Sequence, residues 1–214
     1  MKRVGLLKVL GLVLVAAVVM TSAALAGEAK THDGLFVRVA LGGGTASAKI
    51  SPPGGSLEFS GTAGDVDLAI GKSLNPNFAL HASLWGWSAS KPDAELVITG
   101  LGSDKQGVDG TVTMGAVGLG GTYFFMPLNA YVTGSVGLAR LKVEDNQSGA
   151  DGNSDSGFGF QVAVGKEWWV GQNFGLGVAG DMSYFSAKDN AELLGTTDSW
   201  GGPAFGLRLS ATFN

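Results

Sequence analysis

The segment GFGFQVAVGKEWWVGQNFGLGVAGDMSYF, residues 157–185, alternates large apolar side chains with glycine, small polar groups and single charges. A period of two indicates β-strands, because successive strand residues point to opposite faces. The tripeptide Gly171-Gln172-Asn173 interrupts the alternation and predicts a tight turn. The segment is therefore predicted to be a hairpin with one apolar and one polar face. A water-soluble sheet would turn the polar face outward, whereas a small outer-membrane barrel would turn it inward.

The first 26 residues differ in character from the rest of the chain. Basic residues precede an apolar run from Val9 to Met20, and Ala24-Leu25-Ala26 supplies small residues after it. This order is typical of a cleaved secretory signal peptide, and the apolar run is shorter than the roughly 20 residues of a membrane-spanning helix. We predict a signal peptide at residues 1–26 and a mature barrel domain at residues 27–214.

The composition of the mature segment excludes several classes of protein. Removal of the signal peptide takes three of the 14 basic residues and none of the 18 acidic ones, which leaves a formal charge of −7. An acidic chain without a Lys/Arg cluster argues against nucleic acid as a partner. The chain has no cysteine, so it cannot form disulfides. No later segment has the unbroken apolar length of a membrane helix, so a membrane-spanning form would cross with strands.

Eight alternating segments can be placed along the mature chain, at about residues 34–42, 62–74, 78–89, 111–125, 130–142, 157–170, 174–186 and 202–213. The connections after the second, fourth and sixth segments have three or four residues. The other connections are long, at about residues 45–61, 90–109, 143–156 and 187–201. Short periplasmic turns and long extracellular loops are typical of outer-membrane barrels. The sequence thus predicts an all-β fold, an eight-stranded antiparallel up-and-down transmembrane β-barrel with four long extracellular loops.

Three stretches carry a resemblance to a known family: GLFVRVALGGG at residues 34–44, GFGFQVAVGKEWWVGQNFGLGVAG at 157–180 and GPAFGLRLSATFN at 202–214. Over residues 34–214 the chain resembles small eight-stranded outer-membrane proteins of the OmpA/OmpX type. The resemblance implies a monomer in the cell outer membrane, surrounded by its lipids and lipopolysaccharide and inserted by the barrel-insertion machinery. Such families often end on an aromatic residue, whereas here Phe213 is penultimate and Asn214 is last.

Five charged residues occupy the small-residue phase of the predicted strands: Arg38, Asp67, Glu167, Asp181 and Arg208. The first and last strands become neighbours when the barrel closes, so the two arginines would face the three carboxylates. The interior of an eight-stranded barrel is only wide enough for side chains, and buried charges need partners. We predict a salt-bridge network that plugs the lumen and fixes the strand register, with a narrow porin-like channel as the alternative.

Aromatic residues gather near both ends of the predicted strands, as in the interfacial girdles of membrane barrels. Trp85 and Trp87 point inward in our assignment of the phase, and we expect them to pack rather than to contact a ligand. The predicted aromatic girdle consists of Phe78, Phe125, Trp168, Phe174, Tyr184 and Phe213.

Two motifs suggest chemistry, and both fail a closer test. His81, Ser83 and the later Glu95 match the residue types of the Ser-His-Glu triad of outer-membrane lipid A deacylases. The match weighs little, because His81 lies near a short turn and Glu95 lies in a long loop. The segment from Asp151 to Asp155 opens like a calcium loop but lacks the glycine and the final glutamate that such loops need. We predict a protein that is not an enzyme and has no metal or other cofactor.

The predicted role is structural or in surface interaction, because loops carried on a rigid barrel are common binding sites. The sequence does not identify the partner of the loops. Near the outer rim, Arg140 and Lys142 are placed to meet lipid phosphates. Besides the narrow channel, two further alternatives are a lipid A-modifying enzyme and a soluble lipocalin-like carrier with its apolar face inside.

Overall fold

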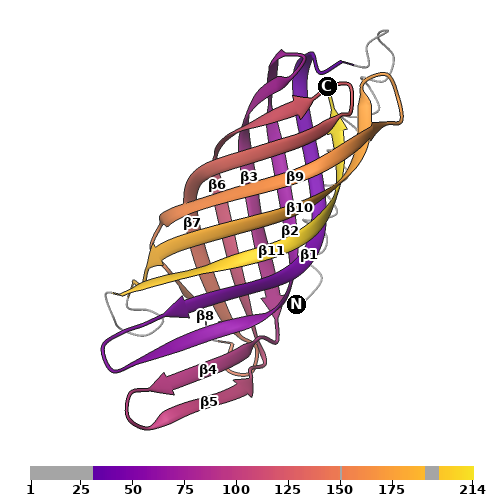
Figure 1. Ribbon diagram of the computed structural model, residues 1–214. Helices are drawn as coiled ribbons and strands as arrows, with labels where there is room; N and C mark the ends of the chain where they lie inside the picture. The colour runs from indigo at the N-terminus through magenta and orange to yellow at the C-terminus, as the bar shows by residue number, and fades with distance from the viewer. Residues whose placement is uncertain (1–30, 150, 191–197) are drawn as a thin grey trace.

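The computed structural model describes residues 31–149, 151–190 and 198–214, so the predicted signal peptide lies outside the described residues. Eight long strands form a closed antiparallel barrel, which confirms the predicted fold class (Figure 1). They are β1 (Gly34–Ile50), β2 (Gly55–Asn75), β3 (Phe78–Ser90), β6 (Gly110–Phe125), β7 (Ala130–Asp145), β9 (Gly157–Trp169), β10 (Phe174–Lys188) and β11 (Ser199–Phe213).

The barrel closes because β1 pairs with the last strand on one side and with β2 on the other. Arg38 on β1 is the Cα partner of Thr212 on β11 and of Ala69 on β2. The remaining barrel strands follow one another in chain order, joined by short turns at the end where the C-terminus lies (Figure 1). Within the described residues, no helix is long and apolar enough to cross a membrane.

Burial is inverted relative to a water-soluble protein. Large apolar side chains on the outer face are widely exposed, for example Leu119 at 68% and Leu207 at 75%. Charged side chains that point into the lumen are buried, such as Arg208 at 5% and Glu167 at 2%. The structure therefore resolves the ambiguity of the alternating pattern: the apolar face points outward, which contradicts the alternative of a carrier with an apolar interior.

The lumen is filled by two clusters of buried apolar side chains with polar residues between them. One cluster contains Trp85, Trp87, Met114 and Trp200, and the other contains Phe36. Along β2 the inward residues run from an alanine of the first cluster to an alanine of the second. The order is Ala63, Asp65, Asp67 and Ala69, which places the two carboxylates between the clusters.

The prediction of a loop over residues 45–61 was wrong. β1 continues to Ile50 and β2 begins at Gly55, so only Ser51-Pro52-Pro53-Gly54 lies outside the strands. Proline cannot donate to a ladder, but it interrupts the pairing only at the tip. The flanking residues pair up to Ile50 with Leu57, and Lys49 lies 3.6 Å from Glu58.

Two other predicted loops also contain strands. Residues 90–109 form the hairpin of β4 (Asp93–Ile98) and β5 (Gly102–Gly107), and β4 pairs with residues 55–60 of β2. Residues 143–156 include the end of β7 and the short β8 (Asp151–Asn153), which pairs with it. β5 and β8 carry no apolar side chain, and β4 is only six residues long and ends on three consecutive apolar residues, so alternation does not reveal these strands. The predicted loop at 187–201 falls partly outside the described residues.

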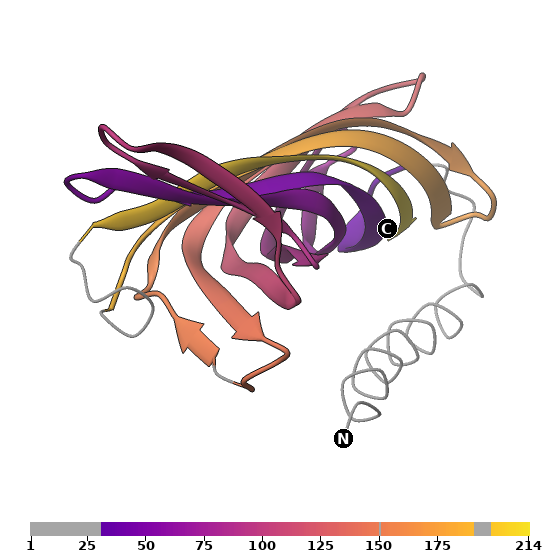
Figure 2. The ribbon, with the colours of Figure 1, turned by 90° about the horizontal axis from the view of Figure 1, so that it is seen from below.

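Residues 55–60 of β2 pair with β4 instead of β3, and with the β4–β5 hairpin at residues 93–107 they form a sheet beyond the closed barrel that we call the outer extension. It lies at the opposite end from the short turns (Figure 1). Figure 2 shows the magenta β4–β5 hairpin projecting beside the indigo β1–β2 hairpin. Every residue of β5 is exposed, and β5 pairs with β4 alone.

Candidate functional site

Three of the five predicted lumen charges come together around Arg208. Its guanidinium lies 3.3 Å from Asp67 and 3.0 Å from Asp181, and all three side chains are at most 4% exposed. Two further residues that the sequence prediction omitted complete the cluster. Asp65 accepts a hydrogen bond of 2.5 Å from Arg208 Nε, and Gln161 accepts one of 3.0 Å from Nη1. We call these five residues the Arg208 cluster.

The two omitted residues had a detectable signal. Asp65 precedes Asp67 by two positions and therefore shares its face of β2. Gln161 lies on the inward face of β9, where its amide donates to Asp67 Oδ2 at 2.5 Å. The cluster thus joins β11, β2, β10 and β9 across the barrel.

Glycine residues on the lumen side leave room for the side chains of the Arg208 cluster. A Cβ atom on Gly206 would lie 2.6 Å from Asp65 Oδ2 and 2.9 Å from Asp181 Oδ1. A Cβ atom on Gly42 would lie 2.8 Å from Arg208 Cγ. Glycine at these positions lets three carboxylates and one guanidinium share a narrow lumen.

Among the ion pairs of the described residues, Arg38 and Glu167 have none with the Arg208 cluster. Arg38 Nη2 donates to Thr133 Oγ1 at 2.9 Å, and its guanidinium lies 4.9 Å from the Tyr131 ring centroid. Glu167 accepts a hydrogen bond of 2.5 Å from Thr212. The separation follows from register: Arg38 faces Thr212, four residues along β11 from Arg208, which is about 13 Å in an extended strand.

His81 and Ser83 form a buried pair in the lumen. His81 Nδ1 lies 2.8 Å from Ser83 Oγ, and Nε2 lies 3.0 Å from Thr122 Oγ1. Hydroxyl groups therefore occupy both ring nitrogens in the described part of the chain, where a triad would place a carboxylate on one of them. Glu95 lies on β4 in the outer extension, as the Cα partner of Glu58 and Lys105. The arrangement is a lumen hydrogen-bond network that reaches Arg38 through Thr133.

The predicted aromatic girdle divides by exposure. Phe125, Trp168 and Tyr184 are 51, 50 and 38% exposed on the outer face, and Phe78 and Phe174 are partly buried. Phe213 differs at 7% exposure, and its Cα partners are Val37 and Phe174. Trp85 and Trp87 are buried in the lumen, at 1 and 4% exposure.

Comparison with known proteins gives a likeness of fold. No family model matches the chain, and no curated protein matches it. Neisserial surface protein A is 18% identical with a TM-score of 0.46, over 82% of this chain and 96% of that chain. The outer membrane protein OprG from Pseudomonas aeruginosa is 11% identical with a TM-score of 0.45, over 86 and 98%. Ail of Yersinia pestis, in complex with the heparin analogue sucrose octasulfate, is 13% identical with a TM-score of 0.42, over 83 and 99%.

The described strands of this chain form a closed eight-stranded barrel, which is the fold that the predicted resemblance implies.

Proposed function

We propose that the protein is a bacterial outer-membrane barrel with a structural and surface-interaction role rather than an enzymatic one. The inversion of burial carries this proposal. Leu119, Val117 and Leu207 expose more than half of their surface, which in water would forgo about 25 cal/mol for each Å² of apolar area. A bilayer removes that penalty, and a closed barrel leaves no strand edge unpaired within it.

The orientation follows from the connections. Short turns and the C-terminus lie at one end of the barrel, and the outer extension lies at the other (Figure 1). Outer-membrane barrels place their short turns in the periplasm and their long connections outside the cell. The outer extension would accordingly be displayed at the cell surface.

The side chains in the lumen support a blocked barrel rather than an open channel. The Arg208 cluster crosses it, and the buried Trp85, Trp87 and Trp200 fill it toward the outer extension. An eight-stranded barrel has an interior that side chains can fill completely. The charges in this view stabilise the barrel, and surface binding falls to the outer extension, since binding residues concentrate on segments positioned by a rigid framework.

The test of this proposal is surface labelling of intact cells. An epitope inserted at residues 99–101, in the β4–β5 turn, should bind its antibody without permeabilisation. The same epitope at residues 171–173, in a short turn, should bind only after permeabilisation. The membrane-extracted protein should also change its gel mobility on heating, and it should add no conductance to planar bilayers. Release of the protein by osmotic shock without a mobility shift would overturn the proposal. Stepwise conductance would show that the lumen conducts and would contradict the blocked barrel.

A further inference from the structure

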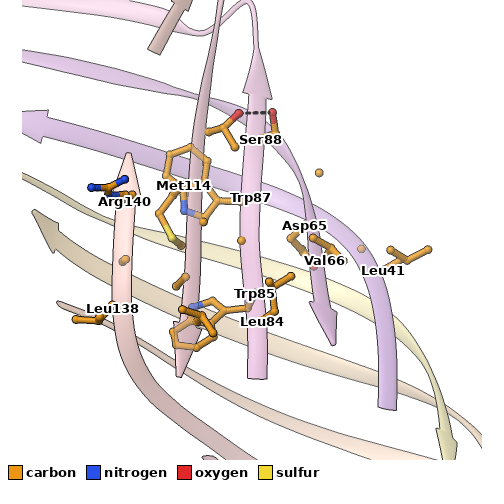
Figure 3. Close-up of a pocket in the computed structure, with 18 of the residues that line it drawn as sticks. Leu41, Asp65, Val66, Leu84, Trp85, Trp87, Ser88, Met114, Leu138 and Arg140 are labelled. Carbon is orange, nitrogen blue, oxygen red and sulfur yellow. Dashed lines mark hydrogen bonds between the residues drawn. The ribbon is translucent and has the colours of Figure 1, made fainter. Parts of the chain in front are cut away.

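A groove of about 850 Å³ runs across the outer wall of the barrel, over β1, β2, β3, β6 and β7 (Figure 3). This volume is in the range of ligand-binding pockets. Its walls are aliphatic side chains that project outward from neighbouring strands and are between 37 and 63% exposed. They are Leu41, Val66, Leu84, Val117 and Leu138.

The groove exists because the wall bends inward where outward positions are glycine. A Cβ atom on Gly86 would lie 2.3 Å from the Met114 carbonyl oxygen and 3.2 Å from Gly115 Cα. Neighbouring strands approach most closely on the concave side of a curved wall, which in most of this barrel is the lumen side. At the inward-facing Gly118, for example, a Cβ atom would lie 2.0 Å from the Val136 carbonyl oxygen. Gly86 lies between the inward-facing Trp85 and Trp87 on β3, so its own side-chain direction is outward. The outer face between β3 and β6 is therefore concave.

No side chain fills the floor of the groove, which leaves room for a ligand. A Cβ atom on Gly115 would meet nothing within 4 Å, and one on Gly64 would meet only the Gly42 carbonyl oxygen, at 3.9 Å. The lining is almost wholly apolar, and the groove faces the side of the barrel that we assign to the membrane. Its chemistry suits hydrocarbon chains.

One end of the groove is polar and cationic. Arg140 is the Cα partner of Gly115, and its Nε donates to Ser156 Oγ at 3.0 Å. Ser88 Oγ and Thr113 Oγ1 lie 2.9 Å apart on the neighbouring strands, as the dashed line in Figure 3 shows. These groups lie on the side of the outer extension, whereas the aliphatic walls continue toward the middle of the barrel.

Arg140 has no carboxylate partner among the ion pairs of the described residues. Nearby Lys142 is engaged, since its Nζ lies 3.0 Å from Glu144 and 3.2 Å from Asp151. A guanidinium is well suited to bind phosphate, because its planar donors match two phosphate oxygens at once.

We propose that this groove binds a phosphorylated, multiply acylated glycolipid of the outer leaflet, the chemistry of lipid A. The acyl chains would lie along Leu84, Val117 and Leu138, and a phosphate would meet Arg140. Five strands span about 19 Å at the usual strand spacing, which is wider than one acyl chain and favours a lipid with several. This inference rests on the proposed outer-membrane location.

The experiment is native mass spectrometry of the full mature barrel in detergent, titrated with diphosphoryl lipid A or with the same lipid stripped of its phosphates. We expect the wild type to retain the diphosphoryl form. Arg140→Gln should weaken its binding about tenfold, since it removes a charge-assisted contact, and should leave the dephosphorylated form unaffected. Gly115→Leu fills the groove and should abolish retention of both lipids.

Two variants serve as matched controls. Lys72→Gln removes an exposed cation near the short turns, and Gly180→Leu places a side chain on the outer face of β10, where a Cβ would meet only Leu207 Cδ2, at 3.9 Å. Both should bind like the wild type. An equal loss of lipid binding in Arg140→Gln and Lys72→Gln would mean that any surface cation attracts the lipid, and would overturn the proposal. An equal loss in Gly115→Leu and Gly180→Leu would mean that the lipid binds anywhere on the outer wall, and would overturn it as well.

A heat-dependent mobility shift of each sample separates folding from binding. A wild type that lacks the shift refutes the proposed membrane barrel, whereas a shifted wild type that retains no lipid refutes only this inference. If Gly115→Leu does not fold, Gly64→Leu fills the same groove and replaces it in the comparison.

Discussion

Substitution of Arg208 by methionine removes the guanidinium and leaves a long side chain in the lumen. Asp65, Asp67 and Asp181 would then lie close together without their cation, at side-chain exposures of 8, 4 and 3%. Removing one partner of a buried ion pair costs about 3–5 kcal/mol, because an uncompensated charge stays behind. We expect Arg208→Met to lower the free energy of unfolding by about that amount.

The change is measured by urea unfolding of the protein folded in lipid vesicles, followed by tryptophan fluorescence and by the heat-dependent gel shift. Arg140→Met is the control, since Arg140 is exposed on the outer face and donates a hydrogen bond to the Ser156 hydroxyl. The loss there should stay below about 1 kcal/mol, as for other exposed charges.

A second substitution tests the cause of the loss. Asp181→Asn in the Arg208→Met background removes one of the uncompensated charges and should restore about 0.5–3 kcal/mol, the size of coupling between residues in contact. A loss in Arg208→Met no larger than in Arg140→Met, or no recovery in the double variant, would mean that water solvates the lumen charges. Either result would refute the reasoning.

Three further outcomes are expected. His32→Ala should lower the free energy of unfolding in vesicles by about 1–2 kcal/mol, because the buried His32 ring loses its 2.8 Å hydrogen bond with Asn129 Oδ1; an unchanged urea midpoint would contradict this. Gly206→Ala should cost about 1–3 kcal/mol in the same assay by displacing lumen carboxylates, whereas Gly180→Ala on the outer face should be nearly neutral. Replacement of residues 93–107 by a short turn should keep the gel shift and vesicle stability within about 1 kcal/mol, because β4 and β5 contribute no strand to the closed barrel; loss of the shift would make the hairpin part of the fold.

Period-two alternation determined the eight barrel strands and their ends at the short turns, because side-chain direction in a strand is a local property. The same pattern failed for β4 and β5, because β5 has no apolar side chain and β4 is a short strand that ends on three consecutive apolar residues. These strands exist because β2 runs past the rim and offers its backbone groups to β4. That support comes from the pairing of distant segments and leaves no local signal.

The residue types of the lumen network could also be predicted, since charges on the small-residue face must lie inside once the apolar face points outward. The choice of partners could not. Arg208 meets Asp65, Asp67 and Asp181 while Arg38 meets Thr133, and the difference depends on how far each strand is shifted against its neighbours. Shear is a property of the closed barrel as a whole.

The outer groove likewise could not be predicted from the sequence, because it depends on the pairing of distant residues. Gly86 and Gly115 are far apart in the sequence and are Cα partners only in the folded barrel. Their pairing lets two backbones approach on the outer face and brings Arg140 to the end of an apolar hollow. The sequence by itself determined which side chains face outward, because alternation is local, whereas register and curvature decided which of them lie together.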